Sequence, residues 1–306
     1  MDPTPANLFA LQVSVSMAFD RGVERAEPWW QKIATDVTST TTKNIFPWEE
    51  MLPDYRLWVG ERRVHRPVVR SQELINQDYE DTTAIPANAL ADDNLGIYRP
   101  RVERLGEAGS NLWNRLVVDA IKASLTATVY DGQFMFDTDH PYNLESPGAG
   151  TMSNKITTAL SLTAFRAARA TMKGYRQANG RNYMVKPNLL VVGPSNEDKA
   201  LDILKADLVE VGSQGAAVTN VVKNSADVLV IPELEEISAT VWMLLDTNGP
   251  LKPFIVQRRQ EPVVVVKDAL TDDNRFWRNE IVVGGHARGA AGYGPWYKAL
   301  YSTGTT

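Results

Sequence analysis

The sequence predicts an α+β fold, and two observations support this fold class. From Val102 onward, apolar residues recur at steps of three and four over about 25 residues, which is typical of one long, broadly apolar helix. Short runs rich in β-branched residues dominate the chain beyond Val228. Because helices and strands mix without a regular βαβ rhythm, a doubly wound parallel sheet is disfavoured.

In the amino-terminal part of the chain, the residue pattern predicts short helices and extended segments but no hydrophobic core. Residues 5–20 carry apolar side chains near helical spacing, so a short helix is expected there. Pro28 favours the start of a second short helix, and the polar, β-branched run Thr38–Thr42 predicts an extended segment. Weak alternation over Glu73–Leu90 predicts an arm-like hairpin. Roughly the first 90 residues are therefore expected to form an extended region with few core-building patterns.

Further helices and strands are expected after the long helix. Ser161 is placed to cap a helix that Asn179-Gly180 would end. Leu189–Val192 reads as a short buried strand, and Gly193-Pro194-Ser195 turns into a third helix. The expected strands that follow are Val228–Ile231, Val241–Leu245, Phe254–Gln257, Pro262–Val266 and Phe276–Arg288.

Composition excludes several classes of protein. The chain has 306 residues, a formal net charge of -5 and no cysteine. A chain without cysteine has no disulfide framework, thiolate zinc site, iron–sulfur cluster or cysteine nucleophile. The net negative charge argues against a protein whose main role is to bind nucleic-acid phosphates. No run of about 18 apolar residues occurs, so no membrane-spanning segment is expected.

Tryptophan is unevenly placed along the chain. There are 8 Trp against 3 His, and the first 60 residues contain Trp29, Trp30, Trp48 and Trp58. This region lacks the patterns of a compact core, and aromatic side chains with a polar group are favoured at protein interfaces. The early tryptophans are therefore expected to contact other protein chains.

The most enzyme-like segment is a loop with carboxylates and an imidazole, Asp137, Asp139 and His140, shortly after Asp131-Gly132. Such groups suit a divalent metal, so a metal-dependent hydrolase using these three residues is the alternative function. Further ligands would have to come from His65, His286 or elsewhere. The simpler interpretation is a turn-rich loop in which Asp and Gly serve backbone geometry. No HExxH, EF-hand, phosphate-loop, GxGxxG or GxSxG pattern is present, so we predict no enzyme, no catalytic or metal-binding residue and no cofactor.

Basic residues cluster in the same early region, at Arg62, Arg63, His65, Arg66 and Arg70. A phosphate-binding patch, and with it a nucleic-acid-binding protein, is one interpretation. The other is an exposed arm that makes salt bridges to acidic neighbours, and the negative net charge favours it.

Several segments, taken in order, carry a family resemblance. They are WQKIATDVTS (Trp30–Ser39), DYRLWVGER (Asp54–Arg62), ELINQDYEDTTAIPANALADDNLGIY (Glu73–Tyr98), YDGQFMFDTDHP (Tyr130–Pro141), SNK (Ser153–Lys155), PNLLVVGP (Pro187–Pro194), GPLKPFIVQRRQEP (Gly249–Pro262) and the carboxy-terminal YGPWYKALYSTG. Together they resemble the major head subunits of Mu-like phages and prophages over nearly the whole chain. No single motif is diagnostic, whereas the ordered series is specific.

The resemblance implies the Hong Kong 97-type capsid fold, in which an arm and an extended hairpin loop, the E-loop, reach over neighbouring subunits. The implied parts are an amino-terminal arm (1–48), a region containing the E-loop (49–95), a peripheral domain with a spine helix (96–185), an axial domain (186–270) and a return strand of the peripheral domain (271–306). The Asp137–His140 segment is then a structural loop.

The resemblance also implies a function. The chain would be a structural head protein that assembles with copies of itself, through hexamers and pentamers, into an icosahedral virion shell around double-stranded DNA. Assembly would take place in the bacterial host cytoplasm, with a scaffold or protease, a portal and decoration proteins as further partners, and with only weak, non-specific contact to DNA. Trp and Arg usually anchor protein interfaces, so the expected interface residues are Trp29, Trp30, Trp48, Trp58, Arg62, Arg63, Arg66 and Arg70. Lysine is absent between Glu49 and Glu103, which argues against a lysine crosslink from the E-loop.

Overall fold

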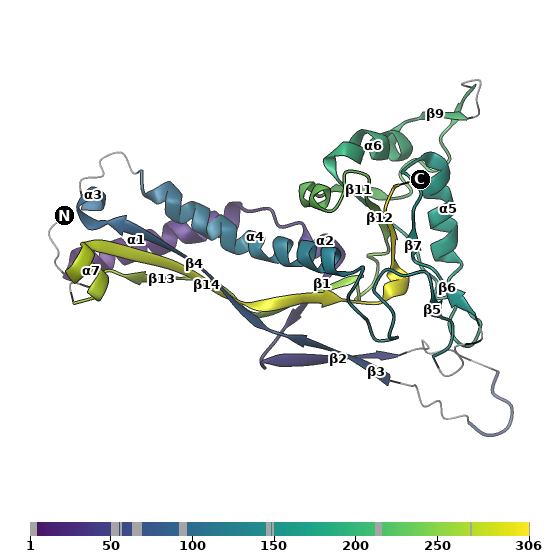
Figure 1. Cartoon of the computed structure of the whole chain (residues 1–306), viewed down its shortest axis with the longest axis horizontal. Helices are drawn as coiled ribbons and strands as arrows, with labels where there is room; N and C mark the ends of the chain where they lie inside the picture. The colour runs from purple at the N-terminus through teal and green to yellow at the C-terminus, as the bar shows by residue number, and fades with distance from the viewer. Residues whose placement is uncertain are drawn as a thin grey trace.

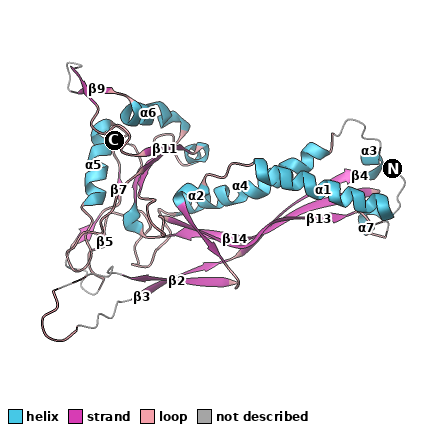
Figure 2. Ribbon diagram, turned by 180° about the vertical axis from the view of Figure 1, so that it is seen from behind, coloured by secondary structure: helices cyan, strands magenta, loops and turns pink. Residues whose placement is uncertain are grey.

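Two sheets, one long and one short, lie at opposite ends of the molecule, and a two-stranded hairpin projects beside them (Figure 1). The computed structural model describes residues 5–49, 55, 57–62, 69–91, 97–144, 148, 150–211, 216–269 and 271–305. Figure 2 shows the same arrangement from behind, with the helices of the elongated end on one side of its sheet. No helix in these ranges is long and apolar enough to span a bilayer.

The elongated end is a four-stranded sheet of order β1-β13-β14-β4. Its strands are β1 (Ala34–Thr38), β13 (Phe254–Lys267), β14 (Glu280–Tyr293) and β4 (Gln77–Pro86). β13 and β14 form a long antiparallel hairpin, and β4 pairs with the other edge of β14. β1 runs parallel to β13, so residues about 220 positions apart in sequence, such as Ala34 and Phe254, lie side by side.

Two long helices cover one face of this sheet. α4 (Arg99–Ala123) buries an apolar stripe that includes Leu105, Leu112 and Leu116, as the three- and four-residue spacing predicts. The predicted long helix is confirmed. α1 (Pro5–Arg25) packs along α4 and extends beyond the predicted residues 5–20. α1, α4 and the sheet enclose a small core that contains Phe19.

The other end is built around a five-stranded sheet of order β11-β8-β12-β15-β7. The strands are β11 (Asp227–Val230), β8 (Leu189–Val192), β12 (Trp242–Leu245), β15 (Ala299–Ser302) and β7 (Lys155–Ile156). Every residue of β8, β12 and β15 is buried, which explains the unbroken apolar run at 189–192. α5 (Leu162–Lys173) and α6 (Glu197–Lys205) flank the sheet.

Shorter elements complete the described fold. The helical ones are α2 (Trp30–Ile33), α3 (Ala87–Ala91), α7 (Asp273–Arg278), η2 (Pro194–Asn196), η3 (Pro232–Glu236) and η4 (Trp296–Lys298). The strands are β2 (Lys43–Glu49), β3 (Val69–Ile75), β5 (His140–Pro141), β6 (Thr151–Met152), β9 (Leu208–Val211) and β10 (Ala216–Thr219). β2 and β3 pair as the projecting antiparallel hairpin.

Three predicted boundaries are wrong. α5 ends at Lys173 rather than near Asn179, because the Gly174 amide caps the carbonyl oxygens of the last turn. The two strands predicted over 254–266 are one strand, β13, in which Pro262 sits at a register irregularity that tolerates a residue without an amide hydrogen. Phe276 lies in helix α7, and β14 begins only at Glu280.

The expectation that the early residues lack a core is also wrong. Trp30 is 1% exposed and Ile33 is fully buried in the main core cluster. The reason is the parallel pairing of β1 with β13, which places α2 against α4. Such a long-range pairing leaves no local pattern in the sequence.

Candidate functional site

The loop that most resembles an enzyme site is a buried structural cluster. His140 is fully buried; its Nδ1 lies 2.6 Å from Asp131 Oδ2 and its Nε2 lies 3.2 Å from Asn154 Oδ1. Its ring stacks on Trp296 with ring centroids 4.0 Å apart. Asn154 also donates from Nδ2 to the carbonyl oxygens of Met135 and Trp296. Because both ring nitrogens face oxygens of the chain, the imidazole has no nitrogen left for a metal.

The other proposed ligands do not join His140. Asp137 accepts hydrogen bonds from the amides of Phe134 and Thr138, as expected for a turn. His286 lies on β14, 3.8 Å from Asp78, and His65 lies outside the described residues. In the part of the chain that the structure describes, no three His, Cys, Asp or Glu side chains are arranged to hold a metal ion.

Two of the four early tryptophans are core residues of their own subunit. The Trp30 ring is buried beneath the guanidinium of Arg258, 5.6 Å from its centroid. Trp48, at the end of β2, is 7% exposed and stacks on Tyr130. Trp29 is partly buried against the same core. The burial of Trp30 and Trp48 contradicts the expectation that they lack contacts within the chain, since almost none of either ring remains for a neighbour.

Trp58 differs from the other three. It is 66% exposed, its Nε1 donates to the Gly60 carbonyl oxygen at 2.7 Å, and the Arg62 guanidinium lies 4.8 Å from its ring centroid. Arg70, on β3, is exposed and lines a hollow of about 440 Å³ together with Asp139. Arg63 and Arg66 lie outside the described residues. Of the described interface candidates, Trp58, Arg62 and Arg70 are therefore available at the surface, and Trp29 is so in part.

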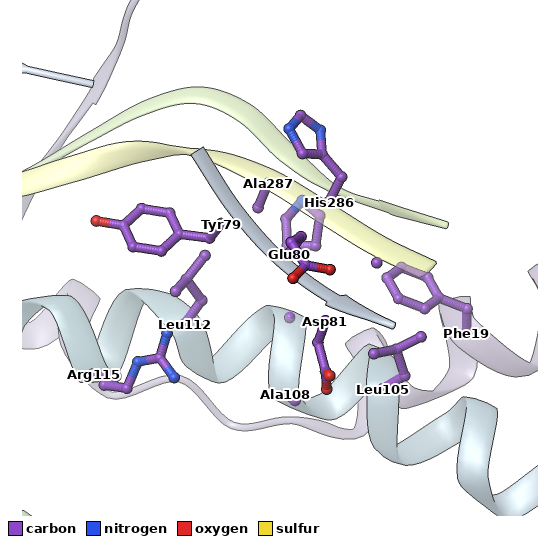
Figure 3. A pocket seen from close by; sticks show the side chains of 13 residues that line it. Phe19, Tyr79, Glu80, Asp81, Leu105, Ala108, Leu112, Arg115, His286 and Ala287 are labelled. Atoms are coloured by element: carbon purple, nitrogen blue, oxygen red, sulfur yellow. The ribbon is translucent and has the colours of Figure 1, made fainter. Parts of the chain in front are cut away.

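A groove of about 310 Å³ separates α4 from the long sheet. Figure 3 shows side chains of α4, among them Leu112 and Arg115, opposite side chains of β4 and β14. The lining of the groove combines apolar side chains such as Phe19 and Leu105 with the exposed carboxylates of Glu80 and Asp81. Burial raises the pKa of the Tyr79 phenol, although Arg115 acts against this rise. Among the described residues that line the groove, no nucleophile lies beside a base.

A second set of cations, absent from the predicted interface, lies on α5 and just beyond it. Arg166, Arg169, Lys173 and Arg176 are spaced by three, four and three residues. The signal that would have found them is local: no acidic residue occurs between Ser146 and Asn196. The net negative charge of the whole chain does not reveal this local excess of positive charge.

Comparison with known proteins shows which family the chain resembles. The family described as Mu-like prophage major head subunit gpT matches residues 8–161, 155–234 and 233–305. The chain belongs to this family. It is a major capsid protein of a Mu-like phage, a structural component of the virion that self-assembles, and not an enzyme. Nothing in the comparisons supports the metal-dependent hydrolase.

Known head proteins resemble this one over most of its length. The major capsid protein of Escherichia phage Mu is 27% identical over 297 residues, which cover 97% of this chain and 73% of that protein. In the procapsid of bacteriophage JBD30, a chain of 24% identity matches with a TM-score of 0.61, covering 98% of this subunit and 75% of its own length. A chain of the JBD30 capsid decorated with minor capsid protein trimers matches with a TM-score of 0.59 at 20% identity, over 72% of this subunit and 93% of its own length. The fold is thus the Hong Kong 97-type fold of phage capsids.

Proposed function

We propose that this head subunit forms hexamers and pentamers that close into an icosahedral shell around double-stranded DNA. The family match across residues 8–305 carries the proposal. The shape suits it, because a long sheet and helix pair, a compact second sheet and a projecting hairpin give one subunit several separate surfaces (Figure 1). Heterologous contacts that close into rings need at least two different surfaces on each copy.

The parts of the subunit follow from the same proposal. Residues 1–48 would serve as the arm, 49–95 as the region with the E-loop, 96–185 as the peripheral domain, 186–270 as the axial domain and 271–306 as the return strand of the peripheral domain. In support, α4 packs against the long sheet, and β8, β11 and β12 lie in the compact five-stranded sheet.

We assign the contact role to the exposed members of the predicted interface. Trp58 and Arg62 lie between β2 and β3, the strands of the projecting hairpin. Tyr55, Leu57 and Val59 around them are more than 70% exposed. A run of large apolar side chains left in water is unfavourable, and contact with a neighbouring subunit would bury it. Trp29, Arg63, Arg66 and Arg70 remain proposed members of this interface.

Further partners belong to the same proposal. A scaffold or protease and a portal would act during assembly in the host cytoplasm. A decoration protein is supported by the similarity to the JBD30 capsid, which is decorated with minor capsid protein trimers. Contact with packaged DNA would be weak and non-specific, since the subunit carries a net charge of -5.

Electron microscopy of the expressed chain, alone and with its scaffold, tests the proposal. Closed shells with fivefold and sixfold clusters of subunits are expected. A chain that stays strictly monomeric under both conditions would refute it.

A further inference from the structure

The charges of the compact end are divided between two consecutive segments. Residues 146–196 contain no acidic side chain and seven basic ones: Lys155, Arg166, Arg169, Lys173, Arg176, Arg181 and Lys186. Residues 197–239 contain three basic side chains and nine acidic ones: Glu197, Asp198, Asp202, Asp207, Glu210, Asp227, Glu233, Glu235 and Glu236. In a protein of net charge -5, this division places opposite charges on two different parts of one structural unit.

The basic charges form a stripe on the outer side of α5. The apolar residues Phe165, Ala168 and Met172 face the core. Arg166, Arg169, Lys173 and Arg176 lie away from it, and we call these four the basic stripe. Among the described residues, no carboxylate forms an ion pair with any of them. The Nε atoms of Arg166 and Arg169 are buried and have no hydrogen-bond partner in the subunit.

The acidic charges gather on α6 and η3, and we call Glu197, Asp198, Asp202, Glu233, Glu235 and Glu236 the acidic flank. Two of them have partners within the subunit. Glu236 pairs with Lys122 at 2.5 Å, and Glu235 accepts hydrogen bonds from the amide and hydroxyl of Ser195, which lower its pKa. Glu233 Oε2 is buried without a hydrogen-bond partner. The other four carboxylates of the flank form no ion pair among the described residues.

The two surfaces lie toward opposite edges of the five-stranded sheet. α6 contacts β11, the strand at one edge, and η3 directly follows β11. α5 contacts β15, which lies next to β7 at the other edge. Figures 1 and 2 agree, since α5 and α6 appear on different sides of this end in both views.

We propose that the basic stripe of one copy docks against the acidic flank of the next copy, as the head-to-tail contact that closes rings of subunits. This inference rests on the proposed function. A ring contact joins two different surfaces of the same chain, and complementary charge selects the correct partner and register. Guanidinium groups bind carboxylates through paired hydrogen bonds, so the arginines of the stripe are well suited to the carboxylates of the flank.

DNA is the competing occupant of the basic stripe. Phosphate binding would explain the stripe alone, but it would leave the acidic flank without a role. A second copy of the chain accounts for both surfaces, and self-assembly supplies that copy at every position of the shell.

A charge-swap experiment tests the contact under conditions in which the wild-type subunit forms shells. One variant, Arg166→Glu/Arg169→Glu, replaces two of the four stripe cations with carboxylates. The other, Asp202→Lys/Glu233→Lys, replaces two of the six flank carboxylates with cations and leaves the stripe unchanged. Each variant alone should lose shells, because the two substituted side chains then face groups of their own charge in every contact. An equimolar mixture should regain assembly in part, because alternating copies restore opposite charges at the substituted positions in every contact of a hexamer and in four of the five contacts of a pentamer.

The matched control is Asp20→Lys/Glu24→Lys, which makes the same charge change at exposed positions of α1. Mixed with the first variant, it should give no recovery. Circular dichroism of each subunit checks folding, and recovery in the swapped mixture would itself show that both variants fold. Shells are counted by electron microscopy and sedimentation.

Three results would overturn the inference while leaving the proposed function intact. The first is normal assembly of Arg166→Glu/Arg169→Glu alone. The second is a swapped mixture that assembles no better than the control mixture. The third is normal shells that retain less DNA, which would assign the basic stripe to nucleic acid. Failure of the wild-type subunit to form shells would instead refute the proposed function itself.

Discussion

Gly22 of α1 and Gly106 of α4 lie where the two helices cross with their backbones in contact. A Cβ atom on Gly22 would lie well inside 3.0 Å of the Glu103 carbonyl oxygen, and one on Gly106 would come equally close to the Phe19 carbonyl oxygen. Real Cβ atoms essentially never approach backbone so closely. Because glycine has no side chain, Gly22 and Gly106 allow α1 and α4 to approach this closely. They therefore determine how α1 packs on the rest of the subunit.

Replacing Gly106 with Ala should destabilise the subunit. In an exposed helix this change would stabilise by up to about 1 kcal/mol, but here the added methyl group meets backbone, and overpacking of this kind costs ~1–3 kcal/mol. We expect a net loss in the free energy of unfolding, measured by chemical denaturation of the isolated subunit. Gly148→Ala is the control, because its Cβ would meet open space. Equal stability of G106A and wild type would show that α1 is not held at this crossing.

The pair of Asp131 and His140 should matter for stability rather than for chemistry. Both side chains are almost fully buried, with Nδ1 and Oδ2 2.6 Å apart. His140→Phe keeps a ring against Trp296 but leaves the buried Oδ2 of Asp131 without its hydrogen bond, and the loss of a hydrogen bond to a charged group in this way costs about 1–3 kcal/mol. Chemical denaturation measures the loss. The double variant His140→Phe/Asp131→Leu should recover part of it, because the buried carboxylate is then gone as well; no recovery would argue against the pair as the cause.

The amino-acid sequence predicts an element correctly where the pattern that indicates it lies within the element itself. α4 and β8 were predicted because each buries a stripe or a run that its own residues display, such as Leu105 and Leu112 in one and Leu190 in the other. The burial of Trp30 was not predictable in this way. It depends on the pairing of Ala34 with Phe254, and neither segment alone indicates the other.

The interface candidates also differ in how far the sequence alone predicts their exposure. The exposure of Trp58 agrees with the predicted interface, and the burial of Trp48 does not, although both residues come from the same tryptophan-rich region. The difference arises from Tyr130, which stacks on Trp48 from a distant loop. The basic stripe on α5 was visible in the sequence as a stretch without acidic residues, and a total charge for the whole chain conceals it.

Stability should decline at alkaline pH because buried tyrosines resist ionisation. Burial raises the pKa of Tyr293 to about 12, and burial together with Asp246 raises that of Tyr297 to about 12. An unfolded tyrosine ionises near pH 10. The free energy of unfolding should therefore be insensitive to these groups below about pH 10 and fall as the pH rises from there toward 12.

Tyr293→Phe tests this cause. The Tyr293 hydroxyl donates to the Ala120 carbonyl oxygen at 2.9 Å, so the variant should lose about 1 kcal/mol at neutral pH and show a shallower decline above pH 10. Denaturation across that pH range measures both effects. Tyr55→Phe, which removes a phenol that is 98% exposed, is the control. An identical alkaline slope in Tyr293→Phe and wild type would contradict the assignment.

Trp30 and Trp58 should separate folding from assembly. Trp30→Ala removes a ring that is 1% exposed in the core, and core truncations of this size cost ~3–5 kcal/mol. Trp58→Ala removes a ring that is 66% exposed, so the free energy of unfolding of the subunit should change by no more than about 0.5 kcal/mol.

Shell assembly, unlike the stability of the subunit, should depend on Trp58. Trp58→Ala is expected to lose shells, seen by electron microscopy and sedimentation, because an aromatic anchor of the interface is gone. Trp58→Phe, which keeps an aromatic ring at the same position, should retain shells and serves as the control. If Trp58→Ala subunits assemble as well as wild type, the ring is not an anchor; if they unfold as easily as Trp30→Ala, Trp58 contributes to the subunit rather than to the shell.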